Sequence, residues 1–326
     1  MKKVLVLLSA AALILVSCAK VKDVYTGSPE SRQIAFSPLA QPTTKAPVAN
    51  AVFPTDYHFY VAAYAAGSGD YFDGAEFANE SSTTWSGVSG SKKYWPLQSA
   101  TLNFLAVTKA GSSTTTFGTT NENYASKVVV QLADNKTAQH DLMYACAQAS
   151  TPSSNVPLTF QHALSWVQFT VSGTAGTGLA VTGIKLNGAA YTGTLTVNLA
   201  NYNSSSETLT ATPSWDATAY ASATKENNVS VPNVSSITVD GTARTVGDGL
   251  LIVPNPTANA SSFTSFVVNY TLDGHAYSVV VTPATADMVM QPGYKYTYNI
   301  GITMHEIKVT ATVGSWSEAS GVAAGI

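Results

Sequence analysis

The chain has 326 residues, of which 11% are Asp, Glu, Lys or Arg, less than half of the roughly 25% that is usual in soluble domains. The formal net charge is -3, and the sequence lacks the Lys and Arg clusters that phosphate contacts need, which excludes a nucleic acid as partner. The many Val, Ile, Leu, Phe and Tyr residues exclude a disordered chain, and the length predicts two domains.

Residues 1–17 have the pattern of a lipoprotein signal peptide. Two lysines precede an apolar run from Val4 to Val16, and Ser17 leads directly into Cys18. The run of about 13 residues is shorter than the roughly 20 that a membrane-spanning helix needs. We therefore expect Cys18 to become the first residue after processing. Acyl chains on its thiol and amine, palmitate among them, would hold the protein on a membrane surface.

Residues 18–45 form a polar, turn-rich tether that contains one short apolar segment. Ile34-Ala35-Phe36-Ser37 alternates apolar and polar residues as a first β-strand does, and Leu39 adds a third large apolar side chain. Pro38 removes a backbone donor that a central strand would need, so the strand is expected to stop there or to lie at an edge.

Basic residues stand on both sides of this segment. A trypsin-like protease that cut between Arg32 and Gln33 would release the lipid anchor and leave the strand in place. A cut between Lys45 and Ala46 would remove both the anchor and the strand, and would open a groove in the sheet. The residues by themselves leave both cleavage sites open.

After residue 46, short alternating runs bounded by turn residues recur, and no window keeps helical periodicity for long, which predicts an all-β fold. The expected strands are, in chain order, 59–64, 102–107, 127–132, 158–171, 184–186, 195–199, 237–239, 250–253, 266–281 as a hairpin, 294–302 and 307–313. The expected loops are 70–93 and 111–123, and a variable polar stretch at 201–233 separates two of the strands. A polar linker at 150–155 would divide the chain into sandwiches at 46–152 and 153–316, followed by a tail at 317–326.

Two segments predict local geometry. In the hairpin, Asp273-Gly274 is a favoured two-residue turn, and it places Leu272 opposite His275 in a register that also aligns the apolar residues. The apolar residues change parity within 164–171, which predicts a β-bulge or a strand that is buried on both faces.

The sequence offers no pattern for catalysis, for a cofactor or for a metal centre, so the chain is not expected to be an enzyme. His140 and Asp141 are neighbours, and on a strand they would face opposite sides of the sheet and could not form a dyad. His305 lacks the second histidine four residues on that would complete a zinc motif. The glycines within 173–178 miss the spacing of a dinucleotide site.

Three further features each have two interpretations. Asp70, Asp73 and Glu76 either gather around a calcium ion or form an ordinary solvated acidic loop. The aromatic residues within 64–95 either form a platform for sugars or pack in a core. Cys146 has no cysteine to pair with once the other one carries lipid, and a buried inert thiol is favoured over a reactive one.

Several of these stretches together resemble the fimbrillin family, the type V pilus subunits of Gram-negative anaerobes. The matching features follow the order of the family over nearly the whole chain: the lipobox at Cys18, Ile34 to Ser37 with Thr44-Lys45-Ala46, Tyr94-Trp95-Pro96, His140 to Met143, Leu158 to Phe169, Leu251 to Pro254, and Pro292-Gly293 with the ending from Tyr294 to Trp316.

The resemblance implies two tandem transthyretin-like β-sandwich domains behind a lipoprotein signal peptide, in a protein of the outer membrane, the cell surface and the fimbrium. It implies that a trypsin-like protease cuts between Lys45 and Ala46 and that a strand from another pilin subunit fills the vacated groove, which is donor-strand exchange. The side chains removed from the groove would be Ile34, Phe36 and Leu39.

The position in a fibre and the ligand stay open. The end of the chain, from Ala319 to Ile326, has only two large apolar residues, so it would be a weak donor, and a tip or minor subunit with a role in adhesion is at least as well supported as a stalk subunit. A rival interpretation is a lipid-anchored surface protein that never polymerises and binds glycans of a host or of other bacteria.

Overall fold

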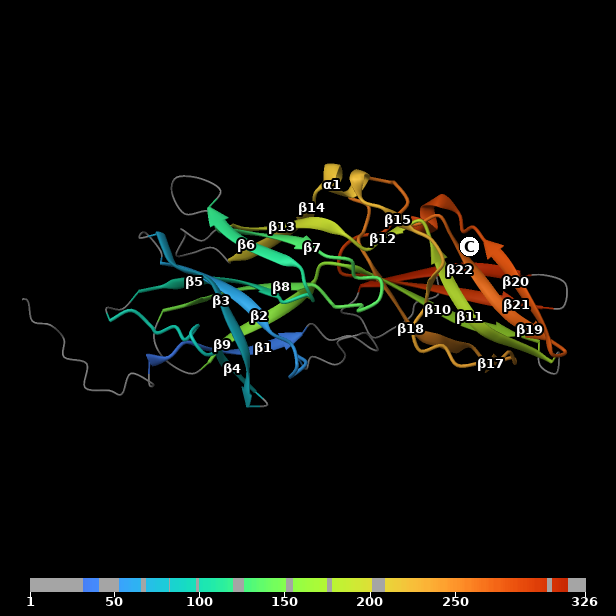
Figure 1. The fold of residues 1–326 in the computed structure, drawn as a ribbon, viewed down its shortest axis with the longest axis horizontal. Helices are drawn as coiled ribbons and strands as arrows, with labels where there is room; N and C mark the ends of the chain where they lie inside the picture. Colours follow the sequence, from blue (N-terminus) through green and yellow to red (C-terminus); the bar gives the residue numbers. More distant parts are fainter. Residues whose placement is uncertain are drawn as a thin grey trace, which may run out of the picture.

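Strands make up most of the described chain, which confirms the predicted all-β class. The computed structural model describes residues 32–40, 53–65, 69–81, 83–97, 100–119, 126–150, 155–174, 178–200, 209–303 and 307–315. These residues form two lobes along the long axis of the molecule (Figure 1). No helix among them is long and apolar enough to cross a membrane.

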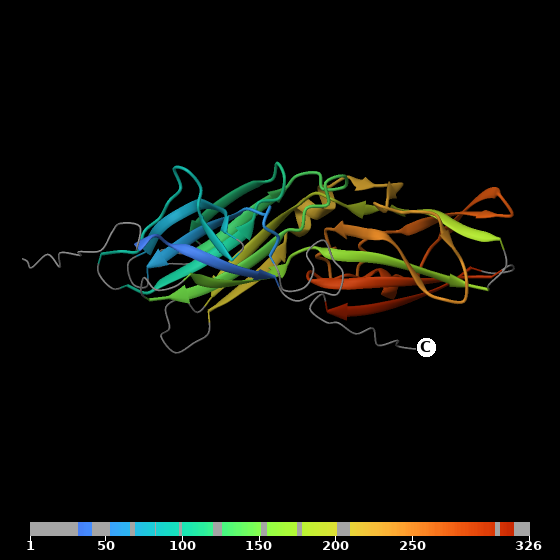
Figure 2. The same cartoon turned by 90° about the horizontal axis from the view of Figure 1, so that it is seen from below.

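The first lobe is built around a closed barrel. Its strands are, in order around the ring, β1 (Ala35–Ala40), β4 (Thr84–Gly87), β3 (Gly69–Ser81), β2 (Phe59–Ala65), β5 (Leu102–Thr108), β8 (Met143–Ala149) and β9 (Val156–His162). β9 pairs with β1 in parallel and closes the ring, whereas the other neighbours are antiparallel. In Figure 2, β1 is the blue strand that runs along the first lobe toward the second.

A four-stranded sheet covers one side of this barrel. It contains β6 (Thr114–Thr119), β7 (Ser126–Leu132), β13 (Gly193–Ala200) and β14 (Thr210–Trp215). Every residue of β5 is buried because β5 has a core on each face. Phe104 packs inside the barrel, while Leu105 packs against Val130 and Leu195 in a second core. The short helix α1 (Ala217–Ser222) follows β14.

The second lobe is a sandwich of two sheets. One sheet has the order β18 (Arg244–Ile252), β10 (Ser165–Gly173), β21 (Tyr294–Ile302) and β22 (Ile307–Ser315). The other contains β16 (Val229–Ser230), β11 (Leu179–Asn187), β19 (Ser265–Leu272) and β20 (His275–Val281), with β17 (Ile237–Thr238) beside β11. The remaining elements are the pair β12 (Ala189–Ala190) and β15 (Lys225–Glu226), and the 3-10 turn η2 (Thr285–Met288). Phe169, Phe266 and Tyr298 pack together in the core of this sandwich.

The two local predictions are confirmed. β19 and β20 pair in the predicted register, with Leu272 opposite His275, and both turn residues, Asp273 and Gly274, have positive φ as such a turn requires. β10 also shows both features that its parity change predicted. Its register against β18 shifts between Val167 and Phe169, and it contributes side chains to two different cores.

The strands do not divide at the expected boundary between 152 and 153. β8 and β9 lie on either side of it and pair in one barrel, and β13 and β14 complete the sheet of β6 and β7. Two expected loops are wrong as well. Residues 70–93 contain most of β3 and all of β4, and residues 111–123 contain β6. The variable polar stretch at 201–233 contains β14, α1, β15 and β16 within its described part.

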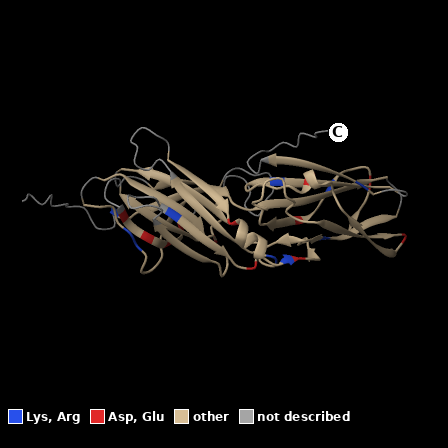
Figure 3. Ribbon diagram, turned by 90° about the horizontal axis from the view of Figure 1, so that it is seen from above, with Lys and Arg blue, Asp and Glu red and all other residues tan. Residues whose placement is uncertain are grey.

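Charged residues are sparse in space as well as in the sequence. Figure 3 shows small numbers of them spread over both lobes. With only 11% charged residues, the chain has a weak overall field and is not suited to attract a strongly charged partner.

Candidate functional site: the seat of the first strand

β1 lies between two strands that are distant from it in the sequence. Five of its residues pair in parallel with β9, from Phe36 opposite Val156 to Ala40 opposite Phe160. On its other side it pairs with β4 through Ala35 and Phe36. We call the space that β1 fills between β4 and β9 the β1 seat. Without β1, both neighbouring strands would present an unpaired edge.

Phe36 fills the centre of the β1 seat. Its ring centroid lies 4.8 Å from that of Phe77, 5.3 Å from that of Phe104 and 5.9 Å from that of Phe59, each in an edge-on arrangement. Ile34 is also fully buried. Burial of one large apolar side chain stabilises a fold by about 1.5–3 kcal/mol, so these two side chains hold β1 with about 3–6 kcal/mol.

The residues just before β1 are fastened to the segment that leads to β5. The Ile34 N–H donates to the carbonyl of Lys93 at 2.8 Å, and the Trp95 N–H donates to the carbonyl of Arg32 at 2.9 Å. The Arg32 guanidinium donates to the carbonyls of Trp95, at 2.8 Å, and of Pro96. The motif around Trp95 entered the sequence analysis only as a mark of resemblance. In the structure its backbone hydrogen-bonds the residues just before β1 and holds the start of the strand in place.

Leu39 does not belong to the β1 seat, contrary to the sequence-based expectation. Its side chain is 49% exposed. Side chains alternate along a strand, so the face that begins with Ile34 and Phe36 continues through Pro38 and Ala40, which are both buried. The seat thus accepts side chains at alternate positions, and small ones occupy its last two.

Pro38 neither ends β1 nor confines the whole strand to an edge. The pairing with β4 stops at Phe36, so from there on β9 is the partner of β1 among the described strands. A residue without an N–H is tolerated where one side of a strand has no partner. The proline therefore lies in the half of β1 that is less firmly held.

Of the residues predicted to be processed, some lie among the described residues and some do not. Cys18, Lys45 and Ala46 lie outside the described residues. Arg32 and Gln33, the alternative cleavage site, lie inside them, and the Arg32 residue is 6% exposed. A trypsin-like protease binds the basic side chain in a pocket of its own, so cleavage after Arg32 requires this end of β1 to detach first.

The three acidic residues for which a calcium site or a solvated loop was considered lie on a strand. Asp70, Asp73 and Glu76 lie on β3, a strand, and the Glu76 carboxylate accepts a hydrogen bond from Lys109 at 3.0 Å and lies 2.7 Å from His58 Nδ1. Burial raises the pKa of Glu76, but the hydrogen bonds from these two basic side chains bring it below its ordinary value. No group of three His, Cys, Asp or Glu residues that could hold a metal ion occurs within the described ranges.

Asp141 forms a buried pair that the sequence did not predict. Its carboxylate lies 2.8 Å from His162 Nδ1, and both side chains are almost fully enclosed. Burial, and then the charge of Asp141, raises the pKa of the nearby Tyr57 phenol well above its ordinary value. The pair joins the end of β9 to the segment before β8, so it stabilises the strand with which β1 pairs.

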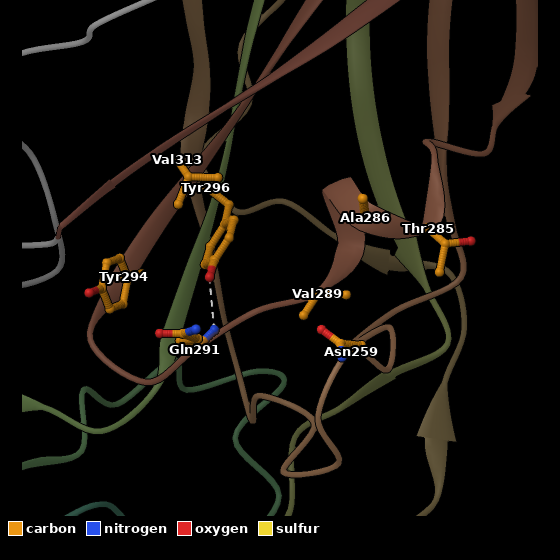
Figure 4. A pocket seen from close by; sticks show the side chains of 8 residues that line it. All are labelled: Asn259, Thr285, Ala286, Val289, Gln291, Tyr294, Tyr296 and Val313. Atoms are coloured by element: carbon orange, nitrogen blue, oxygen red, sulfur yellow. Dashed lines mark hydrogen bonds between the residues drawn. The ribbon is translucent and has the colours of Figure 1, made fainter. Parts of the chain in front are cut away.

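A cavity of about 650 Å³ opens in the second lobe (Figure 4). Tyr296 lies in its wall and accepts a hydrogen bond from the Gln291 N–H at 2.8 Å, and burial raises the pKa of that phenol. Val289 and Asn259 line the opposite side. The lining contains tyrosine as its sole titratable residue type, so it does not form an acid–base pair for catalysis.

The fold is that of solved fimbrial and cell-adhesion proteins. A fimbrial protein from Bacteroides vulgatus superposes with a TM-score of 0.50 at 18% identity, covering 87% of this chain and 99% of that one. A structure described as a cell adhesion protein from Bacteroides ovatus superposes with a TM-score of 0.50 at 12% identity, covering 89% and 99%. No curated protein sequence matches the chain.

The family model described as fimbrillin-like matches residues 44–316, and the chain therefore belongs to the fimbrillin-like family. This confirms the resemblance carried by the short motifs. Membership of this family places the chain in an appendage of the cell surface.

Proposed function

We propose that this chain is a pilus subunit that is exported as a lipoprotein on Cys18, matured by cleavage between Lys45 and Ala46, and assembled when a strand of another subunit enters the β1 seat. The observation that carries the proposal is that β1 closes the barrel by a parallel pairing with β9. A cut after Lys45 leaves β1 joined to the barrel by non-covalent contacts alone, so the strand becomes exchangeable.

Two observations support cleavage at Lys45 over cleavage at Arg32. Arg32 is buried and hydrogen-bonded to two carbonyls, which hinders a protease. The family model begins at residue 44, so the region it describes is nearly the chain that cleavage after Lys45 would leave.

The seat favours a particular kind of incoming strand. Departure of β1 would expose the pockets of Ile34 and Phe36, at a cost of about 1.5–3 kcal/mol each. A donor with large apolar residues at those two alternate positions recovers this free energy. A donor with a residue other than proline at the position of Pro38 also brings a backbone N–H that β1 lacks.

The C-terminal segment of this chain has few apolar side chains with which to fill the groove of another subunit. The segment from Ala319 to Ile326 lies outside the described residues, and Val322 and Ile326 are its only large apolar residues. We therefore propose a tip or minor position, at which a subunit accepts a strand and rarely donates one, with adhesion as the biological output. The outer membrane would be the site of lipid anchoring before assembly.

Trypsin treatment of the purified precursor tests this function. Mass spectrometry should show loss of residues up to Lys45, and size-exclusion chromatography should then show association with other subunits. Lys45→Gln is the matched control and should keep β1 and stay monomeric. A synthetic peptide of residues 32–40 should block association, and the same peptide with Phe36→Ser should not.

A glycan-binding lipoprotein that never polymerises gives the opposite result. It would lose only a tether to trypsin, and neither the peptide nor Lys45→Gln would change its oligomeric state. That outcome would overturn the pilus assignment.

A further inference from the structure

β18 bulges where it passes the junction of the two lobes. The register between β10 and β18 shifts between Val167 and Phe169, so residues 247–249 of β18 stand opposite the single residue Gln168. The bulged sequence is Gly247-Asp248-Gly249. Bulges of this kind redirect side chains and are common beside binding sites.

The two glycines are required by this shape. Gly247 and Gly249 have φ angles of +57° and +81°, a region that other residues rarely adopt. A Cβ on Gly247 would lie 2.3 Å from the carbonyl oxygen of Pro232, and a Cβ on Gly249 would lie 2.5 Å from Nε1 of Trp166. The bulge is therefore a specific structure and not a loose loop.

The bulge forms one wall of a groove of about 910 Å³, which is within the roughly 300–1,000 Å³ of small-ligand sites. A second wall comes from the segment 232–237 and a third from the loop 137–139 of the first lobe. Gln139 has a positive φ of 48°, and its side-chain carbonyl accepts a hydrogen bond from the Leu251 N–H, which ties the two lobes together beneath the groove.

Gln168 lies on the floor with its side chain directed to the groove. The residue is 5% exposed, and within the described parts of the chain its amide makes no hydrogen bond. Because Gln168 lines the groove, its amide N–H and carbonyl can hydrogen-bond a ligand that supplies both an acceptor and a donor.

Asp248 is held firmly beside it. The Asn233 side-chain amide donates to one carboxylate oxygen at 2.5 Å, and the Asp248 N–H donates to the carbonyl of Pro232 at 3.1 Å. The Trp166 indole N–H donates to the Asp248 carbonyl at 3.0 Å. The second carboxylate oxygen has no hydrogen bond from any residue described, and it can accept from a hydroxyl group.

The side chains that line the groove indicate which class of ligand it can bind. Asp248 is its sole titratable residue, and the remaining polar groups are amides and hydroxyls, among them Ser235 and Thr245. One carboxylate is too few for a divalent cation, and an anionic ligand would meet no Lys or Arg in the lining. Amides and a carboxylate placed side by side suit the vicinal hydroxyls of a sugar.

We infer that this groove binds a neutral oligosaccharide, with Gln168 and Asp248 as the residues that recognise its hydroxyl groups. The groove is formed by β10, β18 and the loops of the junction, and it contains no residue of β1 or of the β1 seat. Binding therefore does not depend on maturation or assembly, and the two proposals fail independently.

Calorimetric titration of the full-length chain tests the inference. The probes are neutral tetrasaccharides of glucose, galactose, mannose, xylose and N-acetylglucosamine, with tetragalacturonate as the anionic control. At least one neutral probe should bind, and Gln168→Ala and Asp248→Asn should each weaken its binding by at least about tenfold. The matched controls Gln131→Ala and Asp70→Asn, at exposed positions of β7 and β3, should leave binding unchanged.

A second variant guards against a folding defect. Ser235 is exposed at the rim, so Ser235→Trp should block the groove and abolish binding while the melting temperature stays the same. The inference is overturned if none of the neutral probes binds, if tetragalacturonate binds more tightly than they do, or if binding survives all three groove variants.

Discussion

Phe36 packs among three phenylalanine rings, whereas Leu39, on the same strand, is half exposed. Truncation of a buried phenylalanine removes its contacts and leaves a cavity, so Phe36→Ala in the precursor should lower the free energy of unfolding by about 3–5 kcal/mol. Leu39→Ala should change it by about 0.5 kcal/mol or less. Urea unfolding measures the free energy of unfolding of both variants. Equal losses would show that β1 does not place Phe36 in the core and Leu39 at the surface.

Cys146 is the second residue with a distinct expectation. Burial raises the pKa of its thiol to about 11 from an ordinary value of 9.0. The folded chain then holds the thiol proton more tightly than the unfolded chain, so this contribution to stability is complete below about pH 9 and is lost as the pH rises to about 11.

Reaction with an aromatic disulfide reagent measures this shift in a Cys18→Ser chain. At pH 8 the folded chain should react far more slowly than the urea-unfolded chain, because only about one thiol in a thousand is ionised three pH units below its pKa. Equal rates at pH 8 would contradict the half-buried position of Cys146 and its raised pKa.

Among the elements, two glycines with positive φ allow a paired comparison. A Cβ on Gly274 in the hairpin turn would meet nothing within 4 Å, whereas one on Gly247 in the bulge would strike the carbonyl of Pro232. Gly274→Ala should therefore lower the free energy of unfolding by about 1–2 kcal/mol, the cost of a left-handed backbone at alanine. Gly247→Ala should lower it further because of the steric clash. Chemical unfolding ranks the two variants, and a larger loss at Gly274 would contradict the geometry of the bulge.

The hairpin and β1 show which strand pairings can be predicted from the sequence and which cannot. The register around Asp273-Gly274 could be predicted because turn chemistry and apolar alternation act over a few residues. The parallel pairing of β1 with β9 could not, because parallel strands are joined through long connections and no turn signal marks their register. The burial of Ile34 and Phe36 followed from alternation. The hydrophobicity of Leu39 suggests the same role, but its parity along the strand is opposite to theirs, and its side chain is 49% exposed.

The same reasoning applies to the site. The clip between Arg32 and Trp95 uses backbone carbonyls, which any sequence possesses, so only a short aromatic motif marked its place. Asp141 lies just before β8 and His162 ends β9, so their pairing has no local spacing in the sequence to reveal it. The groove at Gln168 depends on a bulge, and the sequence indicated that bulge through the parity change but not what it would expose.

On the scale of the whole molecule, the cores cross the midpoint of the chain. The second core joins residues of β5 and β7 to residues of β13, and the Trp215 indole N–H donates to the carbonyl of Ala163 at 2.8 Å. Residues 46–152 alone lack β9, β13 and β14, so this fragment should fail to form a cooperative fold, whereas residues 19–316 should melt in a cooperative transition. Calorimetry compares them, and cooperative melting of both 46–152 and 153–316 as separate fragments would contradict the shared core.

Hydrogen–deuterium exchange along β9 tests the exchange of the first strand most directly. In the precursor, the alternate amides of Val156–Phe160 that face the β1 seat should be protected. They should exchange rapidly once residues up to Lys45 are removed, and protection should return when another subunit or the peptide of residues 32–40 is added. Unchanged protection after that removal would show that the barrel is complete without β1, and would contradict assembly through its seat.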